Sequence, residues 1–363
     1  MDGSQTIKFI KSVSVGYILQ WWKKKILLFG FTTIFFIITY YYLLTNATLS
    51  KPYIVLQKIQ GNNISCHHKR DGDVLPAAEK VLLSSPENSI FFHETSCRGG
   101  LDPRQACSIE SAARAHPSWQ INVLFSSPVT ELILERTCLA KLCEFHNIKF
   151  ARVHINEYAE GTPLESLVNN GSLEKSSWRV EHTSDVLRYL TLYKWGGVYL
   201  DTDMIVVKPF DDLAGNWVGK QDDEFVNAAA IGLSRDTIGR KFANIIINEL
   251  RTSFKPDVWI QNGPGVITRV LEHACSTKNI SEWSKDTCGF PVYDPEYFYP
   301  VPYESKDLYF SKEELENVNR AYTHHIWNKL SKDIQITADS VYAKLAKIYC
   351  PSIYNFFGND FGR

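Results

Sequence analysis

The chain of 363 residues lacks an excess of charge of either sign, since 39 lysine and arginine residues face 40 aspartate and glutamate residues. A chain so balanced carries no global field that would indicate a nucleic-acid partner. It also lacks any C-x2-C pair, which argues against a structural zinc site. No G-x-G-x-x-G follows the first expected strand, so a dinucleotide site is not indicated either.

Long uncharged runs are confined to one place near the start. Residues 26–44 (ILLFGFTTIFFIITYYYLL) contain no charge and are long enough to cross a bilayer as a helix. Five lysines precede the run, and the first charge after it is Lys51. The positive-inside rule therefore predicts a cytosolic tail over residues 1–25, a transmembrane signal anchor over 26–44 and a lumenal remainder. The alternatives are a cleaved signal peptide and a buried core helix, which the length and uniform apolarity of the run disfavour.

The cysteines and the glycosylation sequons fit a lumenal location. All eight cysteines lie beyond the hydrophobic run, where an oxidising compartment permits disulfides. Their pairing is left open, because spacing alone does not determine connectivity. Acceptor sequons occur at Asn46, Asn63, Asn170 and Asn279.

The pattern beyond the run predicts an α/β domain. Residues 45–86 are polar and without clean periodicity, which predicts a stem, and residues 87–363 form the expected catalytic domain. Expected strands alternate with expected helices in the order strand 90–92, helix 105–116, strand 121–125, helix 130–146 and strand 150–155. This alternation indicates parallel βαβ units, which bind ligands at the carboxyl ends of their strands. Helices are also expected at 312–319 and 337–348.

The stretch from Asp185 to Phe210 carries the clearest chemical signal. A helix over 180–195 ends at two glycines and leads into the short apolar strand Val198–Leu200, which Asp201 and Asp203 follow. If the strand continues, both carboxylates point to one face and repel each other. The sequence therefore predicts a divalent metal, carrying a diphosphate, in front of them.

Each of the other candidate site residues also has a purely structural interpretation. Asp185 and Arg188 share one helix face, as catalytic groups or as a plain ion pair. Asn227, inside an expected strand over 225–233, either satisfies the backbone or faces the site. Gly263 opens an expected helix and either presents N–H groups to an anion or forms a plain turn. His325, with Trp327 beside it, is either structural or meets the metal, the phosphates or the base.

The stretch WGGVYLDTD, preceded by SDVLR and followed by IVVKPF, resembles the Asp-x-Asp core of the Golgi α1,4-glycosyltransferases. The resemblance extends from IFFHETS and CSIESAARAHP to QNGPGVITRV, FYPVPY, HHIWNK and YCP. It implies a GT-A fold, which is a Rossmann-like mixed sheet flanked by helices, and a single-pass type II protein of the Golgi membrane. It also implies retaining transfer of galactose or an N-acetylhexosamine from a UDP-sugar, with Mn²⁺, in α1,4 linkage onto a terminal β-linked sugar of a glycolipid or glycan.

The resemblance also assigns roles by position. It implies that Asp203 ligates the metal directly, that Asp201 binds the ribose of the donor and a metal-bound water, and that Asp185 and Arg188 hold the donor sugar. His325 is a further candidate metal ligand. The other implied donor-binding residues are Tyr199, Asn227, Gln261, Gly263 and Trp327.

Several points stay open. Ala228 and Gln261 depart from the family pattern, which leaves the donor sugar undetermined. No residue stands out as a nucleophile, which favours attack by the acceptor on the face that the diphosphate leaves. Two rival functions are considered. One is a haloacid-dehalogenase-type phosphatase, but the Asp-Thr-Asp-Met-Ile of this chain does not match the D-x-D-x-[TV] motif of those enzymes. The other is an inactive lectin-like or scaffolding relative. The oligomeric state is left open.

Overall fold

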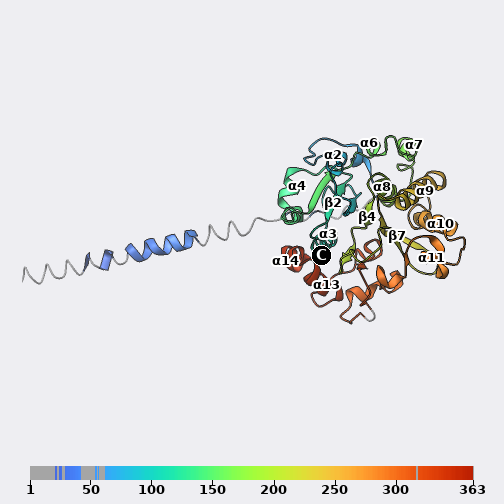
Figure 1. Ribbon diagram of the computed structural model, residues 1–363. Coiled ribbons are helices and arrows are strands. Elements are labelled where there is room, and N and C mark those ends of the chain that lie inside the picture. The colour runs from blue at the N-terminus through green and yellow to red at the C-terminus, as the bar shows by residue number, and fades with distance from the viewer. Residues whose placement is uncertain are drawn as a thin grey trace, which may run out of the picture. The chain divides into compact units, whose positions relative to one another are not determined.

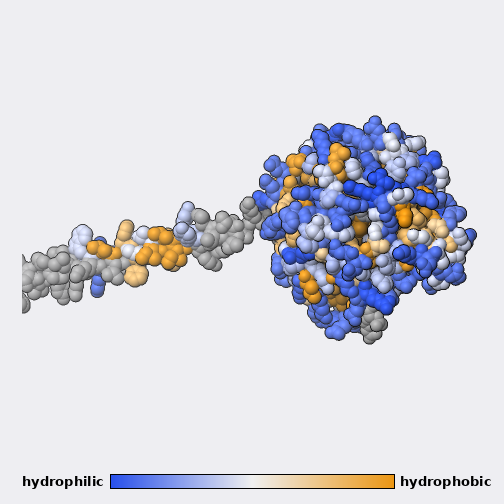
Figure 2. All heavy atoms as spheres, in the orientation of Figure 1, coloured by the Kyte–Doolittle hydropathy of each residue, from blue (hydrophilic) through white to orange (hydrophobic). Residues whose placement is uncertain are grey.

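The computed structural model describes residues 21–22, 24–26, 29–41, 54, 56, 62–315 and 318–362. The chain forms two compact units, Met1–Tyr53 and Ile54–Arg363. In the described part of the first unit, one helix (Lys24–Tyr41) is long and apolar enough to cross a membrane. Figure 2 shows an apolar surface along this helix, whereas the visible face of the second unit is mainly hydrophilic. Residues 27–28 and 42–44 of the predicted span lie outside the described residues.

The second unit is built on a seven-stranded mixed sheet of order β3-β2-β1-β4-β7-β6-β8. Strands β3, β2, β1 and β4 run parallel, β7 is antiparallel to both β4 and β6, and β6 pairs in parallel with β8. The strand direction therefore changes between β4 and β7. The strands are β1 (Ser89–Glu94), β2 (Gln120–Phe125), β3 (Ile148–Arg152), β4 (Gly197–Leu200), β6 (Trp217–Lys220), β7 (Val226–Leu233) and β8 (Val292–Tyr293).

Helices cover this sheet, as Figure 1 shows. Helices α8 (Arg179–Trp195), α9 (Thr237–Ser253) and α10 (Pro264–Ala274) pack together beside β4 and β7. Helix α3 (Pro103–Ala115) packs against α13 (Val341–Tyr349) and α14 (Pro351–Phe357), and the disulfide Cys107–Cys350 joins it to the start of α14. A two-stranded sheet pairs β5 (Met204–Val206) with β9 (Thr323–His325). The mixed α/β class predicted from the alternation is confirmed.

The remaining elements are short. They are η1 (Ser65–His68), α2 (Ala78–Leu82), α4 (Glu131–Arg136), α5 (Cys138–Leu142), α6 (Ile155–Ala159), α7 (Glu165–Asn169), η2 (Trp259–Gln261), η3 (Ile280–Glu282), α11 (Lys285–Cys288), η4 (Pro295–Tyr297), η5 (Tyr303–Phe310), α12 (Asn328–Ser331) and η6 (Gly358–Asp360). The disulfide Cys275–Cys288 closes the loop between α10 and the end of α11.

Two helix predictions are wrong. The single helix expected over 130–146 is interrupted at Thr137, whose backbone is extended and whose hydroxyl accepts from the N–H of Leu139 to begin α5. The helix expected over 312–319 is absent from its described residues, 312–315 and 318–319. That segment offers few apolar side chains to bury, and most of the stability of a helix in a protein comes from packing an apolar face.

Part of the segment predicted as a stem, residues 62–86, packs on the second unit. Ile64, Ala78 and Leu82 are buried in the core, and the disulfide Cys66–Cys97 fixes η1 to the chain after β1. Arg152, at the end of β3, forms an ion pair with Asp73 at 2.9 Å. Burial of these side chains holds residues 62–86 on the domain.

Candidate active site

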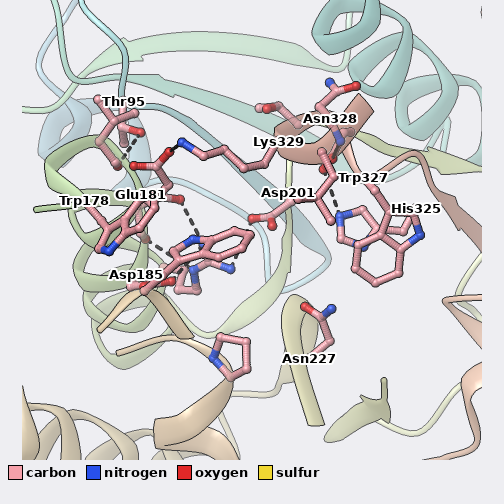
Figure 3. A pocket seen from close by; sticks show the side chains of 18 of the residues that line it. Thr95, Trp178, Glu181, Asp185, Asp201, Asn227, His325, Trp327, Asn328 and Lys329 are labelled. Carbon is pink, nitrogen blue, oxygen red and sulfur yellow. Dashed lines mark hydrogen bonds and ion pairs between the residues drawn. The ribbon is translucent and has the colours of Figure 1, made fainter. Parts of the chain in front are cut away.

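A cavity of about 790 Å³ opens at the carboxyl ends of β1 and β4, the two neighbouring strands between which the strand order reverses from β3-β2-β1 to β4. Sheets of this kind bind ligands at such a switch point. The cavity is lined by the end of β1, the first turns of α8, the turn after β4, the start of β7 and the chain that follows β9. Figure 3 shows its side chains, with Trp178 and Asp185 on one side of Asp201 and with His325 and Trp327 on the other.

The two carboxylates of the Asp-x-Asp motif lie on a turn, and not on the strand that the sequence suggested. Strand β4 ends at Leu200 and β5 begins at Met204, so Asp201 and Asp203 occupy the connection between them. Pairing of β5 with β9 places Met204 opposite His325. One ligand atom from each of Asp201, Asp203 and His325 lies within 4.8 Å of the others. The structure thus brings the predicted metal-site residues together.

Asp203 is held in its charged form. Its Oδ1 lies 3.2 Å from Nε2 of His325, and its Oδ2 accepts a hydrogen bond from the backbone N–H of Asn328 at 2.7 Å. Burial opposes the charge, but His325 and this N–H outweigh it and keep the pKa of Asp203 below its usual value. Two carboxylates and one imidazole match the ligands that Mn²⁺ and similar divalent cations accept, so the donor set fits a metal.

Arg188 joins the helix to the motif. Its guanidinium lies 3.1 Å from Oδ1 of Asp185 and 3.2 Å from Oδ1 of Asp201, and it donates to the carbonyl of Ala228 at 2.7 Å. Tyr199 donates its hydroxyl to the same Asp201 oxygen at 2.5 Å. This positive charge lies between two carboxylates, so the pair predicted from i,i+3 spacing is a buried network and not a surface ion pair.

The charged form of Asp185 is less favoured than that of Asp203. Burial raises the pKa of Asp185 to about 7, although Arg188 works in the opposite direction. Gly263, the N-cap of α10, lies directly against it. A Cβ on Gly263 would lie 3.0 Å from Cγ of Asp185 and closer still to Oδ1. The absence of a side chain at Gly263 is therefore what lets Asp185 occupy its place.

The other predicted donor-binding residues divide into two groups. Tyr199, Asn227 and Trp327 line the cavity. Asn227 also accepts from the backbone N–H of Ala229 at 2.9 Å, so it serves the backbone and faces the site at once. Gln261 and Gly263 do not line the cavity. The side-chain amide of Gln261 lies against the guanidinium of Arg269 on α10, where its oxygen can accept from that group, and its direct role with the donor stays a prediction.

The sequence interpretation missed several lining residues. Glu94, at the carboxyl end of β1, is buried, and its Oε2 has no hydrogen-bond partner within the described chain. Burial raises the pKa of Glu94 to about 7. Its position at the end of the first parallel strand was a signal that could have identified it. Trp178 and Trp259 were missed as well, because nothing local connects residues so far apart in the chain.

Comparison with known proteins finds matching family descriptions and relatives. Residues 102–222 match the family description "Glycosyltransferase sugar-binding region containing DXD motif", and residues 236–357 match "Alpha 1,4-glycosyltransferase conserved region". Lactosylceramide 4-alpha-galactosyltransferase of Rattus norvegicus is 33% identical over 280 residues, which is 75% of this chain and 76% of the relative. The Homo sapiens protein of the same name is 31% identical over 274 residues, covering 73% and 76%.

Two more distant similarities are also found. Alpha-1,4-N-acetylglucosaminyltransferase of Homo sapiens is 25% identical over 284 residues, covering 75% of this chain and 81% of the relative. A crystal structure of a galactosyltransferase in complex with donor and acceptor sugar analogues aligns with 14% identity and a TM-score of 0.39, covering 71% of this chain and 95% of that chain.

Proposed function

We propose a specific reaction for this chain, which belongs to the glycosyltransferase family that includes lactosylceramide 4-alpha-galactosyltransferase. The reaction moves galactose or an N-acetylhexosamine from a UDP-sugar, in α1,4 linkage, onto a terminal β-linked sugar of a glycolipid or glycan. The convergence of Asp201, Asp203 and His325 beside Arg188 in one cavity carries the proposal. No observation favours an inactive relative.

The metal assignment follows from the donor set. Asp203 and His325 would hold the ion directly and Asp201 through water, with Mn²⁺ as the proposed metal. When bound, such an ion supplies Lewis-acid stabilisation to a departing diphosphate. Arg188 adds a fixed positive charge that needs no reorganisation, because Asp185 and Asp201 already hold it in place.

The donor sugar is proposed to lie against Asp185, Arg188 and Asn227. Neither Ala228 nor Gln261, the two departures from the family pattern, lines the cavity, so we expect neither to choose the sugar directly. Galactose is the first donor to test, because the relatives above 30% identity are named as galactosyltransferases.

Retention is proposed to proceed by same-face attack of the acceptor. A double displacement needs a free carboxylate as nucleophile. Three candidates are already engaged, since Asp185 and Asp201 contact Arg188 and Asp203 contacts His325 and Asn328. These contacts engage the three carboxylates in binding. Glu94 also lines the cavity and has an unpartnered oxygen, but burial raises the pKa of Glu94 to about 7, so below that pH it is protonated and a weak nucleophile.

The proposed location is the Golgi membrane, with one span and a lumenal catalytic domain. Three of the four sequon asparagines, Asn63, Asn170 and Asn279, are described, and all three are exposed. In cells, we expect a loss of apparent mass after treatment with an N-glycosidase. A protein that carries no N-glycan at any of the three would contradict the lumenal orientation.

The central experiment assays the full chain in detergent with UDP-Gal, UDP-GalNAc or UDP-GlcNAc and a β-galactoside acceptor, with Mn²⁺ or EDTA. Asp203→Asn should lower transfer about 100-fold or more, as for loss of other preorganised electrostatic groups. Asp212→Asn, at an exposed carboxylate outside the cavity lining, is the matched control and should leave transfer unchanged. Transfer that survives both EDTA and Asp203→Asn would refute the metal assignment.

A further inference from the structure

Two tryptophans lie at the side of the cavity away from the metal ligands. The rings of Trp178 and Trp259 stack with centroids 5.7 Å apart and an interplanar angle of 29°. Both line the cavity, and 40% of the surface of Trp259 is exposed. Burial in the core would explain a stacked pair without any ligand, but here Trp178 is only half-buried and Trp259 is exposed, so the pair leaves apolar surface in water.

We propose that Trp178 and Trp259, here called the aromatic platform, form the acceptor subsite and stack on the apolar face of a terminal β-galactoside. The proposal rests on the glycosyltransferase function proposed above and names residues that select its acceptor. A galactopyranose has one face of C–H groups and a rim of hydroxyls. It therefore requires a flat apolar surface with polar groups at its edge.

The polar groups are present beside the aromatic platform. Lys329 lies over the ring of Trp178, 5.3 Å from its centroid, and forms an ion pair with Glu181. Both residues line the cavity (Figure 3). An ammonium group donates and a carboxylate accepts, so together they match sugar hydroxyls, which do both.

The platform is held in place before any ligand arrives. The N–H of Ser177 donates to the carbonyl of Pro256 at 3.0 Å, and the hydroxyl of Ser177 donates to Asp257 at 3.1 Å. Nε2 of His182 lies 3.3 Å from the carbonyl oxygen of Trp259. These contacts join the chain before α8 to the chain before α10, so binding would cost little ordering entropy.

The location also suits an acceptor. Trp178 is the N-cap of α8, and Asp185 follows roughly 10 Å along the same helix at 1.5 Å per residue. Trp259 begins η2, and η2 leads directly to Gly263, which lies against Asp185. Both rings are thus carried by the elements that position the proposed donor-sugar residues. An acceptor on the platform would therefore lie next to the proposed donor-sugar residues. Figure 3 shows Trp178 on the side of Asp201 opposite His325.

The test measures the acceptor and the donor separately on the full chain in detergent, with lactose as the acceptor. Trp178→Ala and Trp259→Ala should each raise the KM for lactose roughly tenfold. Hydrolysis of the UDP-sugar without acceptor, and the KM for the donor, should stay within about twofold. Trp119→Ala is the control. Trp119 immediately precedes the amino end of β2 and does not line the cavity, so this change should alter neither KM.

Two further variants keep the proposal decisive if an alanine variant does not fold. Trp259→Phe retains an aromatic face and should stay close to wild type, whereas Trp259→Leu retains apolar bulk without a ring and should lose lactose affinity. Equal KM values for lactose in Trp259→Leu and Trp259→Phe would overturn the platform. Absence of both transfer and donor hydrolysis in the wild-type chain would instead overturn the proposed function.

Discussion

The middle and the start of helix α8 face the same cavity but differ in almost every physical property. In the middle, Asp185 and Arg188 are buried and belong to an ionic cluster, defined here as Asp185, Arg188, Asp201, Asp203 and His325. At the start, Trp178 and its partner Trp259 form the aromatic platform, which is open to solvent.

The difference has a simple physical origin. Charges interact more strongly where water is excluded, so a group that must stabilise a developing charge works best when buried and already paired. Recognition of a neutral sugar depends on contact area, which requires an open surface. One helix can therefore serve both needs, because its buried turns carry the charges and its half-buried N-cap carries one of the two rings.

The strongest test of this comparison removes Arg188. Arg188→Met leaves the buried Asp185 and the half-buried Asp201 without their partner, so the free energy of unfolding at pH 8 should fall by about 3–5 kcal/mol in urea titrations. Arg320→Met, which breaks an exposed pair with Glu296, is the control and should cost about 1 kcal/mol or less. Equal losses in the two variants would show that the ionic cluster behaves as ordinary surface charge.

The pH dependence of stability gives the next largest effect. Folded Glu94 keeps its proton up to about pH 7, whereas the unfolded side chain loses it near 4.5. The folded state therefore binds more protons in this window, and stability should fall as the pH rises from about 4.5 to 7, by on the order of 3 kcal/mol. Glu94→Gln should remove the contribution of Glu94 in urea titrations between pH 5 and 8, whereas the similar contribution of Asp185, whose pKa is also raised to about 7, should remain. A variant with the wild-type slope would place the titrating group elsewhere.

Gly263→Ala should disturb the ionic cluster through the contact of residue 263 with Asp185. The new methyl group would overlap Asp185, so we expect a loss of about 1–3 kcal/mol of stability together with lower transfer. In Gly265→Ala the nearest atom is the flexible end of Arg269, at 3.0 Å, so the effect should be smaller. Thermal unfolding and transfer rates are measured for both variants. Full activity in Gly263→Ala would mean that Asp185 can move without affecting transfer.

The smallest effect concerns the stability of the aromatic platform. In a double-mutant cycle of Trp178→Ala and Trp259→Ala, the coupling energy for unfolding should be about 0.5–1.5 kcal/mol. A coupling as large as the loss caused by Arg188→Met would mean that the two rings are part of the core. The contrast between the platform and the ionic cluster would then disappear.

Local pattern was enough to predict much of this protein. The glycines after Trp195 end α8, and the apolar residues that follow form β4, so the Asp-x-Asp motif was correctly expected after a buried strand, although it lies on the turn that follows β4. The i,i+3 spacing of Asp185 and Arg188 was also sufficient, because helix geometry places both on one face. The role of Gln261 could not be predicted, because its direction depends on Arg269 of the next helix.

What the sequence by itself determined is therefore local: the apolar run, the order of strands and helices, the family motif and the charged face of α8. The tertiary structure alone decided which distant residues meet. Pairing of β5 with β9 brings His325 to Asp203, and the packing of the chain before α8 against the chain before α10 stacks Trp178 on Trp259. Backbone geometry sets the first kind of relation within a few residues. The second kind depends on how a whole core packs, which no short pattern encodes.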